Sequence, residues 1–391
     1  MQQKKPIILA LVHYYLPGFK SGGPVRSIAN LVDQLSDVFD FRIITLDRDK
    51  FDKNSYPNVT INSWNSIGKA QVYYISENKI ISHNYVKLFS EIPYDVLYIN
   101  SFFDPLFAQW PLLLRRLGKL PNKPIVIAPR GEFSSGALFI KYWKKIPYLW
   151  LSSILGTYRS LIWAATSNYE AEDIRKAVGL TTAQRIIVTP NLIAQYSDNA
   201  VRVQTARNDE TPLRIVFISR VSPKKNLDFA LRVLARLKCP VHFDIYGPID
   251  SVVYWKQCQA LMANLPINVY ARYHGPAEYK QVSGILAEHD LFFFPTRGEN
   301  FGHVIIESIM AGTPVLIADT TPWRHLEMSG VGWELPLADE QQFANKINYV
   351  AQISGKEYVL LRERVLAYAK TYHSKHEAIA STRSMFFDAL S

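Results

Sequence analysis

The sequence predicts an α/β protein with two doubly wound domains, each a parallel sheet covered by helices on both faces. Short apolar runs alternate with helical patterns along the chain, as expected of strand-helix-strand units. A polar stretch at 196–211 interrupts the alternation, which then starts again. With 391 residues and 48% apolar content, the chain is long enough for two domains that each bury a core.

The first domain is expected over residues 1–195. Its strand-like runs lie at 7–12, 42–46, 72–75, 96–99, 125–128, 161–165 and 186–188. Helical patterns fit between them at 24–35, 105–117 and 171–178. Strands separated by helices are usually parallel, so their carboxyl ends are expected at one edge of the sheet.

The second domain is expected over residues 212–372, after a linker at 196–211. Its predicted strands are 213–219, 241–246, 269–273, 291–294 and 315–317. Its predicted helices include 226–237, 279–288 and 341–350. The tail from Glu357 to Leu390 has a helical pattern, and 373–391 is expected to form a separate C-terminal helix.

The stretch 290–312 combines a strand, a turn and a helix. Leu291 to Phe294 is a short apolar run, Pro295 to Gly298 is typical of a turn, and Phe301 to Ala311 has helical spacing. Such a junction lies at the carboxyl edge of a parallel sheet, where α/β proteins bind ligands.

Groups at this junction suit a phosphorylated, hydroxylated ligand. Backbone N–H groups around Gly302 and His303 could bind a phosphate. Glu299 lies in the loop and Glu307 in the second turn of the helix, where helix geometry points its side chain back towards the loop. Both carboxylates could therefore contact one polyhydroxylated ligand. A helix-surface acid in water is the competing interpretation of Glu307.

The residues ENFG at 299–302, Glu307, and AGTPV at 311–315 resemble the E-x7-E segment of retaining glycosyltransferases of family 4. Those enzymes have the GT-B fold, so the resemblance implies two Rossmann-like domains facing each other across a cleft. It also implies that the helix at 373–391 returns to the first domain. The resemblance covers most of the second domain and is looser in the first.

Two cations, Arg220 and Lys225, follow the predicted strand 213–219 and precede a helix. Positive charges at the carboxyl end of a strand can neutralise a diphosphate leaving group without a metal. Their spacing matches the Arg-to-Lys pair of family 4 enzymes. Lys224 is adjacent, so the register is ambiguous by one residue, and a solvated loop or an ion pair is the structural alternative.

The first domain has a glycine-rich turn, with Gly18 and then SGGP at 21–24, directly after its first strand. Glycines let a backbone approach a ligand closely, and Pro24 suits a first helical turn. The G-x-G-x-x-G fingerprint is absent, which disfavours a nicotinamide or flavin dinucleotide. In family 4 the corresponding loop faces the donor's phosphates, and a turn without ligand contact is the alternative.

Two further first-domain features are weaker. Asp47 and Asp49 have the D-x-D spacing by which other glycosyltransferases hold a divalent metal, but the rest of the pattern is metal-independent, so no metal is expected. Many family members have a histidine in the first-domain loop near the reaction centre, whereas this chain has PRGE at 129–132. Arg130 becomes the candidate for the first-domain catalytic group.

The resemblance implies a nucleoside-diphosphate sugar as donor, with uridine or guanosine as the base. The catalytic candidates are Glu299, Arg220, Lys225 and Arg130. The donor-binding candidates are Gly22, Gly23, Arg220, Lys225, Gly247, His274, Gly275, Glu299, Asn300, Phe301, Gly302, His303 and Glu307.

Each group of candidates has an implied role. Arg220 and Lys225 would stabilise the leaving diphosphate. Glu299 would hold the sugar hydroxyls, and Glu307 the ribose. The motifs YGP at 246–248 and HGP at 274–276 end strands and could line the base, although ordinary turns explain them equally well.

The chain is basic, with 44 Lys+Arg against 34 Asp+Glu. Between residues 105 and 169 we count nine basic residues and one acidic residue, Glu132. Within 139–163 the cations, including Lys141, alternate with Tyr and Trp, a composition suited to the headgroups of an anionic membrane. The alternative is a helix pair packed on the sheet, with Trp and Leu inside, and Pro147 is expected to interrupt any single long helix.

The predicted function is transfer of a sugar to an acceptor hydroxyl with retention, in bacterial cell-surface polysaccharide or glycolipid synthesis. The acceptor would be a glycan or lipid-linked. A nucleotide-sugar epimerase of the same fold is the enzymatic alternative. A third alternative is a basic nucleic-acid-binding protein. This hypothesis is weakened because no helix-turn-helix, zinc or RNA-binding signature accompanies the charge.

The remaining features indicate a cytoplasmic protein, peripheral on the inner face of the membrane. Cys239 and Cys258 are the only cysteines, which indicates a reducing compartment rather than a disulfide framework. The N-terminal apolar run 7–12 ends in a bulky polar segment and reads as a strand rather than a signal peptide. No stretch approaches the length of a membrane-spanning helix.

Overall fold

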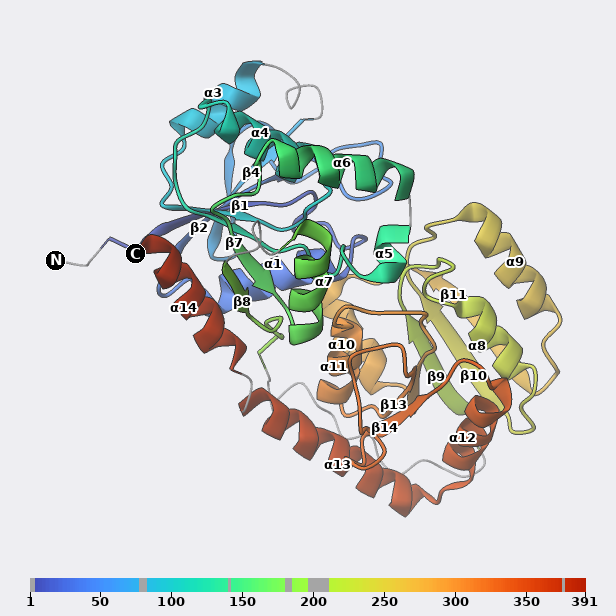
Figure 1. The fold of residues 1–391 in the computed structure, drawn as a ribbon. Helices are drawn as coiled ribbons and strands as arrows, with labels where there is room; N and C mark the ends of the chain where they lie inside the picture. The colour runs from blue at the N-terminus through green and yellow to red at the C-terminus, as the bar shows by residue number, and fades with distance from the viewer. Residues whose placement is uncertain (1–3, 77–82, 140–141, 180–184, 196–210, 375–376) are drawn as a thin grey trace. The chain divides into compact units, whose positions relative to one another are not determined.

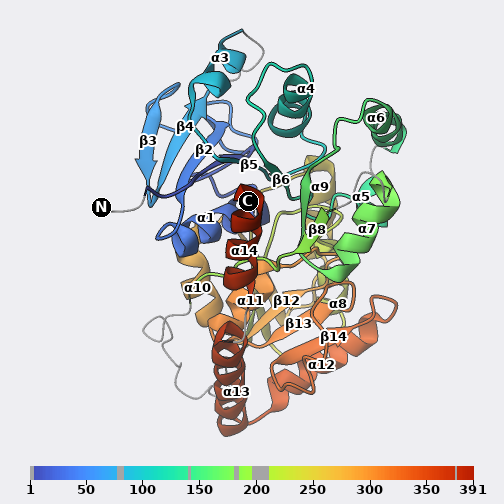
Figure 2. The ribbon, with the colours of Figure 1, turned by 60° about the vertical axis from the view of Figure 1, so that its left-hand side comes forward.

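The computed structural model describes every residue except 1–3, 77–82, 140–141, 180–184, 196–210 and 375–376. The chain divides into two compact units (Figure 1 and Figure 2). The first unit comprises residues 1–192 together with 377–391, and the second comprises 193–376. The predicted linker, apart from Thr211, lies outside the described residues.

The first unit is built on an eight-stranded sheet in the order β3-β4-β2-β1-β5-β6-β7-β8. Every pairing is parallel except that of β3 with β4. Its strands are β1 (Ile7–Leu11), β2 (Asp40–Leu46), β3 (Trp64–Ile67), β4 (Ala70–Ile75), β5 (Val96–Ile99), β6 (Ile125–Ile127), β7 (Ile162–Ala165) and β8 (Arg185–Val188). The sequence did not predict β3, because its WNSI segment is short and only half-buried.

Helices cover both faces of this sheet. On one face α1 (Gly23–Leu35) and the last helix, α14 (Ala378–Leu390), share a core that includes Ile28 and Phe386. The other face packs against a second core that includes Leu112, Leu149 and Ile174. The remaining elements are α3 (His83–Glu91), a π-helical turn η1 (Pro105–Gln109), α4 (Trp110–Arg116), α5 (Ser135–Phe139), α6 (Tyr142–Ile154) and α7 (Asn168–Val178).

The second unit has a six-stranded parallel sheet in the order β11-β10-β9-β12-β13-β14. Its strands are β9 (Leu213–Ile218), β10 (Val241–Tyr246), β11 (Val269–Gly275), β12 (Leu291–Phe294), β13 (Val315–Ala318) and β14 (Gly332–Leu335). The chain proceeds from β9 to β11 in one direction and from β12 to β14 in the other. The topological switch point therefore falls between β9 and β12, where open α/β sheets bind ligands.

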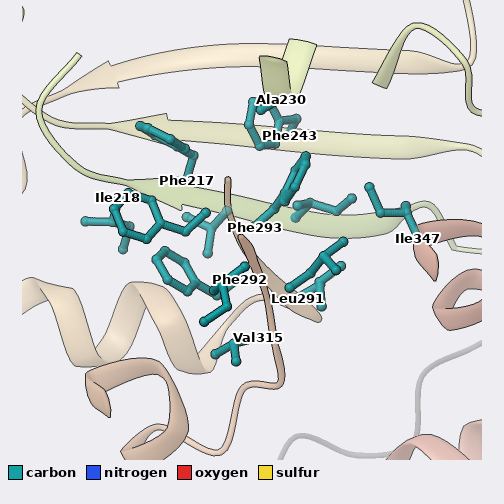
Figure 3. Close-up of a cluster of buried hydrophobic side chains, with 14 of the residues drawn as sticks. Phe217, Ile218, Ala230, Phe243, Leu291, Phe292, Phe293, Val315 and Ile347 are labelled. Carbon is teal, nitrogen blue, oxygen red and sulfur yellow. The ribbon is translucent and has the colours of Figure 1, made fainter. Parts of the chain in front are cut away.

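Two groups of helices flank this sheet: α8 contacts α9 and α12, whereas α11 contacts α10 and α13. Their bounds are α8 (Leu227–Leu234), α9 (Val252–Ala263), α10 (Tyr279–Ala287), α11 (His303–Met310), α12 (Glu340–Gln352) and α13 (Gly355–Ser374). Because β12 is central and covered on both sides, all of its residues are apolar and buried. Figure 3 shows Phe292 and Phe293 within this core, which gives the turn at Pro295 a rigid base.

The predicted boundary at residue 372 is wrong for the last two helices. Helix α13 continues to Ser374, and the separate C-terminal helix begins at Ala378 rather than at 373. The reason is tertiary packing, because Tyr372 stacks on Tyr368 and lies against Trp323 of the same unit.

Candidate functional site

The loops after β9 and β12 lie side by side at the switch point of the second unit. Their strands pair directly, with Ile215 opposite Leu291. Beyond the strands, the backbone oxygen of Lys224 accepts hydrogen bonds from the Arg297 N–H at 2.9 Å and from Thr296 Oγ1 at 3.2 Å. The two segments that the sequence singles out, 220–225 and 295–303, are thus joined into one surface at the carboxyl edge.

Lys225 and Glu299 form an ion pair between these two loops. The side chains are only 11% and 14% exposed. Burial lowers the pKa of Lys225 below its ordinary value, and the Glu299 carboxylate opposes that shift. The neighbouring Lys224 is exposed, whereas Lys225 is the lysine that pairs with Glu299 of the β12 loop.

Arg220 lies in the same loop as Lys225, after β9, and carries a second positive charge. Its Nη1 donates to Asp250 Oδ2 at 2.6 Å, and 31% of its side chain is exposed. Arg220 is also among the charges that lower the pKa of Lys225, after burial itself. A guanidinium has five N–H donors, so this pair leaves Arg220 with capacity to bind an anion.

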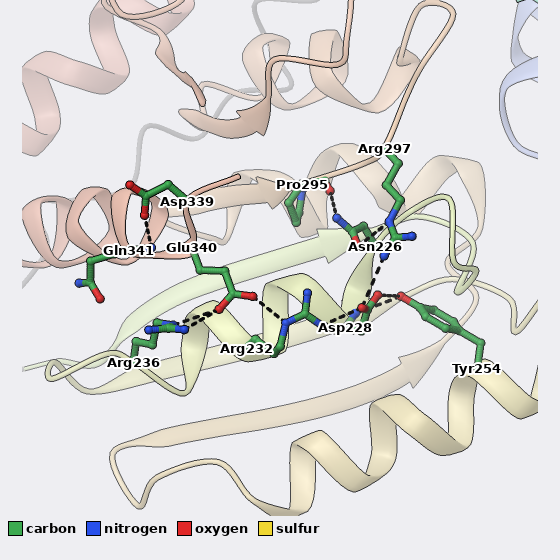
Figure 4. A network of polar contacts seen from close by, with 10 residues as sticks. All are labelled: Asn226, Asp228, Arg232, Arg236, Tyr254, Pro295, Arg297, Asp339, Glu340 and Gln341. Atoms are coloured by element: carbon green, nitrogen blue, oxygen red, sulfur yellow. Dashed lines mark hydrogen bonds and ion pairs between the residues drawn. The ribbon is translucent and has the colours of Figure 1, made fainter. Parts of the chain in front are cut away.

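A polar network behind the site fixes the two loops (Figure 4). Asn226 is buried in a left-handed conformation, donates to the Pro295 oxygen at 2.9 Å, and accepts from Arg297 Nε at 3.0 Å. Arg297 approaches Asp228 at 3.7 Å, and the Tyr254 hydroxyl donates to the same carboxylate. Burial tends to raise the pKa of Asp228, but hydrogen bonds from Tyr254 and Arg232 outweigh it and lower the pKa below its ordinary value.

Helix α11 begins at the end of the β12 loop and directs its first N–H groups out of the helix. Its N-cap is Gly302, at φ +80°, which has no side chain to cap them. The Phe301 ring lies against the His303 ring, with 4.9 Å between centroids. The backbone oxygen of Phe301 accepts a hydrogen bond from Trp323 Nε1 at 2.6 Å. In this unit Asn300 is a half-buried loop residue and Glu307 a half-buried helix residue.

The ends of β10 and β11 form a flat surface beside the Arg220 loop. The Tyr246 and His274 rings stack with centroids 4.5 Å apart and an interplanar angle of 8°. Gly247 has φ +145°, and a Cβ there would lie 1.8 Å from the Ser219 oxygen, so only glycine fits. Gly275 also has a positive φ.

The first unit has its own carboxyl edge, with the glycine turn after β1. Gly22, at φ +71°, is the N-cap of α1, and Gly23 is its first residue. The Asp49 carboxylate accepts hydrogen bonds from the N–H groups of Phe19 at 2.7 Å and Lys20 at 3.0 Å. Asp49 therefore holds the turn in place. No group of three or more potential metal ligands occurs among the described residues.

Arg130 lies at the same edge, and its guanidinium joins three segments of the first unit. Nε donates to Asn100 at 2.8 Å, Nη1 to Asn191, and Nη2 to the Tyr98 hydroxyl at 2.6 Å. Asn100 directly follows β5, and Arg130 itself, at φ +55°, lies beyond β6. The structure thus gives Arg130 a bracing position, which the sequence could not reveal.

The sequence reasoning missed one pair at this edge, His13 and Asp104. His13 follows β1, and its Nδ1 lies 2.6 Å from Asp104 Oδ2, with side chains 34% and 10% exposed. The other oxygen of Asp104 accepts from the N–H groups of Leu106 and Phe107, which fixes the carboxylate. A carboxylate on Nδ1 orients an imidazole and leaves Nε2 for another contact. The only signal was a histidine after the first strand, within VHYYLPG.

A separate hollow of about 740 Å³ lies in the first unit. Its lining includes Ile7, Asp95 and Lys123. These residues are at or just before the amino ends of β1, β5 and β6. The hollow is therefore at the sheet edge opposite the glycine turn and His13.

Two doubly wound α/β units with this architecture define the GT-B fold class. Sucrose-phosphate synthase from Thermosynechococcus elongatus has a similar structure, with a TM-score of 0.72, 16% identity and 99% of each chain covered. The structure of Anabaena HepE in complex with UDP and glucose aligns with a TM-score of 0.65 and 17% identity, covering 97% of this chain and 99% of HepE.

The sequence is also similar to known proteins over part of its length. Residues 200–371 match the family described as "Glycosyl transferases group 1". An uncharacterized 41.2 kDa protein in the cps region of Klebsiella pneumoniae is 24% identical over 227 residues, which are 57% of this chain and 60% of that protein. The D-inositol 3-phosphate glycosyltransferase of Jonesia denitrificans is 30% identical over 112 residues, 27% of this chain and 26% of that enzyme.

Proposed function

We propose that this protein is a glycosyltransferase that moves a sugar from a nucleoside-diphosphate sugar to an acceptor hydroxyl, with retention and without a bound metal. The observation that carries the proposal is the meeting of Arg220, Lys225 and Glu299 on two joined loops at the switch point of the second unit. The group 1 family match spans all three residues. The similarity to the structure of Anabaena HepE in complex with UDP and glucose favours a nucleotide-sugar donor.

In this proposal, Arg220 and Lys225 neutralise the diphosphate as it leaves. The N-terminus of α11, around Gly302 and His303, adds the positive end of a helix dipole to the same anion. Fixed positive groups in a partly buried site stabilise developing charge without reorganisation, which is the role a divalent ion has in other enzymes.

The carboxylates and the flat aromatic surface bind the rest of the donor. Glu299 accepts hydrogen bonds from the sugar hydroxyls, and Lys225 holds this carboxylate in the loop. Glu307 binds the ribose hydroxyls. The base lies against the surface of Tyr246 and His274, at the strand ends that carry Gly247 and Gly275. In the first unit, Gly22 and Gly23 are the candidates for phosphate binding.

The transfer step exchanges one bond at the anomeric carbon for another. The bond from that carbon to the phosphate oxygen breaks, the acceptor oxygen attacks from the same face, and the leaving phosphate takes the acceptor's proton. Atoms and charge balance without any other reactant. Retention of configuration rests on the resemblance to family 4. No residue of this chain is assigned as a nucleophile.

The test is release of nucleoside diphosphate from UDP- and GDP-sugars, with and without candidate acceptor glycans and glycolipids. A transferase releases UDP or GDP in proportion to acceptor. Interconversion of the sugar with no acceptor would establish the epimerase instead, and binding of nucleic acid without either reaction would establish the third alternative. The Klebsiella relative in a cps region favours acceptors of bacterial cell-surface polysaccharide or glycolipid synthesis.

A further inference from the structure

Helix α6 of the first unit is apolar on two opposite sides. Its inner side is packed into the unit through the buried Leu149 and the partly buried Ile146 and Tyr148. Its outer side carries five exposed apolar residues at helical spacing. We call them the α6 outer face: Trp143, Pro147, Trp150, Leu151 and Ile154.

The exposure of this face is large for apolar side chains. Trp143 is 72% exposed, Trp150 68% and Ile154 60%. The arrangement rules out the packed-inside interpretation for both tryptophans. It also corrects the expectation for Pro147, which lies inside α6 without ending it. Pro147 removes only one ladder hydrogen bond, that to the Trp143 oxygen, and its ring lies on the exposed side.

The apolar surface continues beyond the end of α6. Leu155, 45% exposed, follows the helix directly, and its backbone oxygen accepts from Arg116 Nε at 3.1 Å. That bond brings the end of α4 to the end of α6, and Leu117, 62% exposed, is the next residue after Arg116. An exposed apolar patch of this kind often marks a surface that contacts another molecule or a membrane.

Several exposed cations adjoin this apolar surface in the sequence. Lys144 is exposed at its edge, with Nζ 4.7 Å from the centre of the Trp143 ring, and Arg116, Lys119 and Arg159 are also exposed. The single acid between residues 105 and 169, Glu132, is turned inward, where its carboxylate accepts from Ser101 and from the Phe102 and Phe103 N–H groups.

We infer that the α6 outer face docks on an anionic lipid bilayer, with its tryptophans at headgroup depth and the surrounding cations on the phosphates. Tryptophan prefers the membrane interface, and exposed Lys and Arg are attracted to anionic lipid. A second copy of the chain fits less well, because it would bring the same positive charge to the contact. None of the described helices is long and apolar enough to cross a membrane, so the contact is peripheral.

This inference deepens the proposed function and rests on it. A transferase held at a lipid surface would act on a lipid-linked acceptor. The structure also selects the residues to test. Lys145 is unsuitable, because it donates to the Ala137 oxygen at 2.7 Å and lies over the Phe103 ring, inside the unit. Lys141 lies outside the described residues.

The experiment is co-sedimentation of the full chain with vesicles of phosphatidylcholine, with and without 30% phosphatidylglycerol. We expect wild type to sediment with the anionic vesicles at low salt and to be released by 0.5 M salt. The double variant Trp143→Ser/Trp150→Ser, and separately Lys119→Glu/Lys144→Glu, should each reduce the bound-to-free ratio about tenfold or more.

Matched controls lie in the second unit. Val252 and Val253 are 65% and 72% exposed on α9, and Lys238 and Lys256 are exposed. The variants Val252→Ser/Val253→Ser and Lys238→Glu/Lys256→Glu should bind vesicles as wild type does. Equal loss in these controls would overturn the inference, because the attraction would then not be local to the α6 outer face.

Two further outcomes would also overturn it: wild type that stays in the supernatant with anionic vesicles at low salt, or a wild-type dimer that the tryptophan variant converts to a monomer. UDP binding, measured on the same preparations, separates this inference from the proposed function. We expect the α6 variants to bind UDP as wild type does. Failure of vesicle binding with UDP binding intact rejects only the docking, whereas absence of UDP binding throughout rejects the proposed donor site.

Discussion

The carboxyl edges of the two units use charged residues in opposite ways. In the second unit Arg220 shares one ion pair with Asp250, and the mostly buried Lys225 links two loops through Glu299, so each cation pairs with one carboxylate. In the first unit, the guanidinium of Arg130 bonds to three residues of its own unit. We propose that a cation after a buried strand can bind a ligand or brace a loop, and that few internal partners favour ligand binding.

The largest effect is expected for Arg220→Ala. Loss of a fixed positive group next to the leaving phosphates should lower kcat about 100-fold or more, with little change in Tm, because the partly exposed pair with Asp250 adds little stability. The matched control is Arg236→Ala. Arg236 is an exposed arginine just after α8, and it pairs with Glu340. A kcat for Arg220→Ala within threefold of the control would reject the leaving-group role.

Arg130→Ala should have the opposite profile. Three hydrogen bonds from a charged group are lost inside the first unit, so we expect a free energy of unfolding lower by about 2 to 4 kcal/mol. The kcat of the remaining folded protein should change much less than in Arg220→Ala. Denaturant unfolding and kcat, measured on the same preparation, check both. A normal midpoint with a 100-fold lower kcat would instead support the catalytic assignment made from the sequence.

Glu299→Gln and Glu307→Gln should both lower turnover. Each loses charge-assisted hydrogen bonds to the donor, worth about 1.5 to 3 kcal/mol, so turnover should fall about tenfold or more. Glu299→Gln also leaves Lys225 as a buried, unpaired cation, so its Tm should fall. Near-normal turnover in both variants would rule out the two roles.

The His13 and Asp104 pair sharpens the comparison within the first unit. Asp104→Asn keeps the capping oxygen for Leu106 and Phe107 but weakens the hold on the imidazole. If His13 contacts the acceptor, His13→Gln and Asp104→Asn should each raise the acceptor KM several-fold and leave the donor KM unchanged. Unchanged acceptor KM values would make the pair purely structural.

The smallest effect concerns Asp228 in the network behind the second-unit site. Because its pKa is lowered in the folded protein, its contribution is complete above about pH 3.9, the ordinary Asp value, and is lost as the pH falls through the lower folded pKa. Asp228→Asn should therefore be less stable than wild type by about 1 kcal/mol at pH 7, with the difference shrinking towards pH 3. Thermal unfolding across that range measures it. A difference that is constant with pH would assign the loss to packing.

Alternation of apolar runs predicted all but two of the strands, because most of the parallel strands are rich in apolar residues that the helices cover. The exceptions, β3 and β14, are edge strands with mixed polarity. In the site, strand-end position identified Arg220, Lys225 and Glu299 as neighbours. Strand-end position could not distinguish Lys224 from Lys225. It also could not show that Arg130 is hydrogen-bonded within its own unit or that His13 pairs with Asp104. Those facts depend on side-chain direction and on contacts between residues as many as 91 positions apart.

The central claim is that the carboxyl edge of the second unit binds a nucleoside diphosphate through its own cations. Isothermal titration of UDP and GDP into the protein in excess EDTA tests it most directly. We predict that one of the two nucleotides binds without metal, at least tenfold more weakly to Arg220→Ala, and with unchanged affinity to Arg236→Ala. Absence of binding by both nucleotides, or binding that appears only when manganese is added, would contradict the claim and return attention to Asp47 and Asp49.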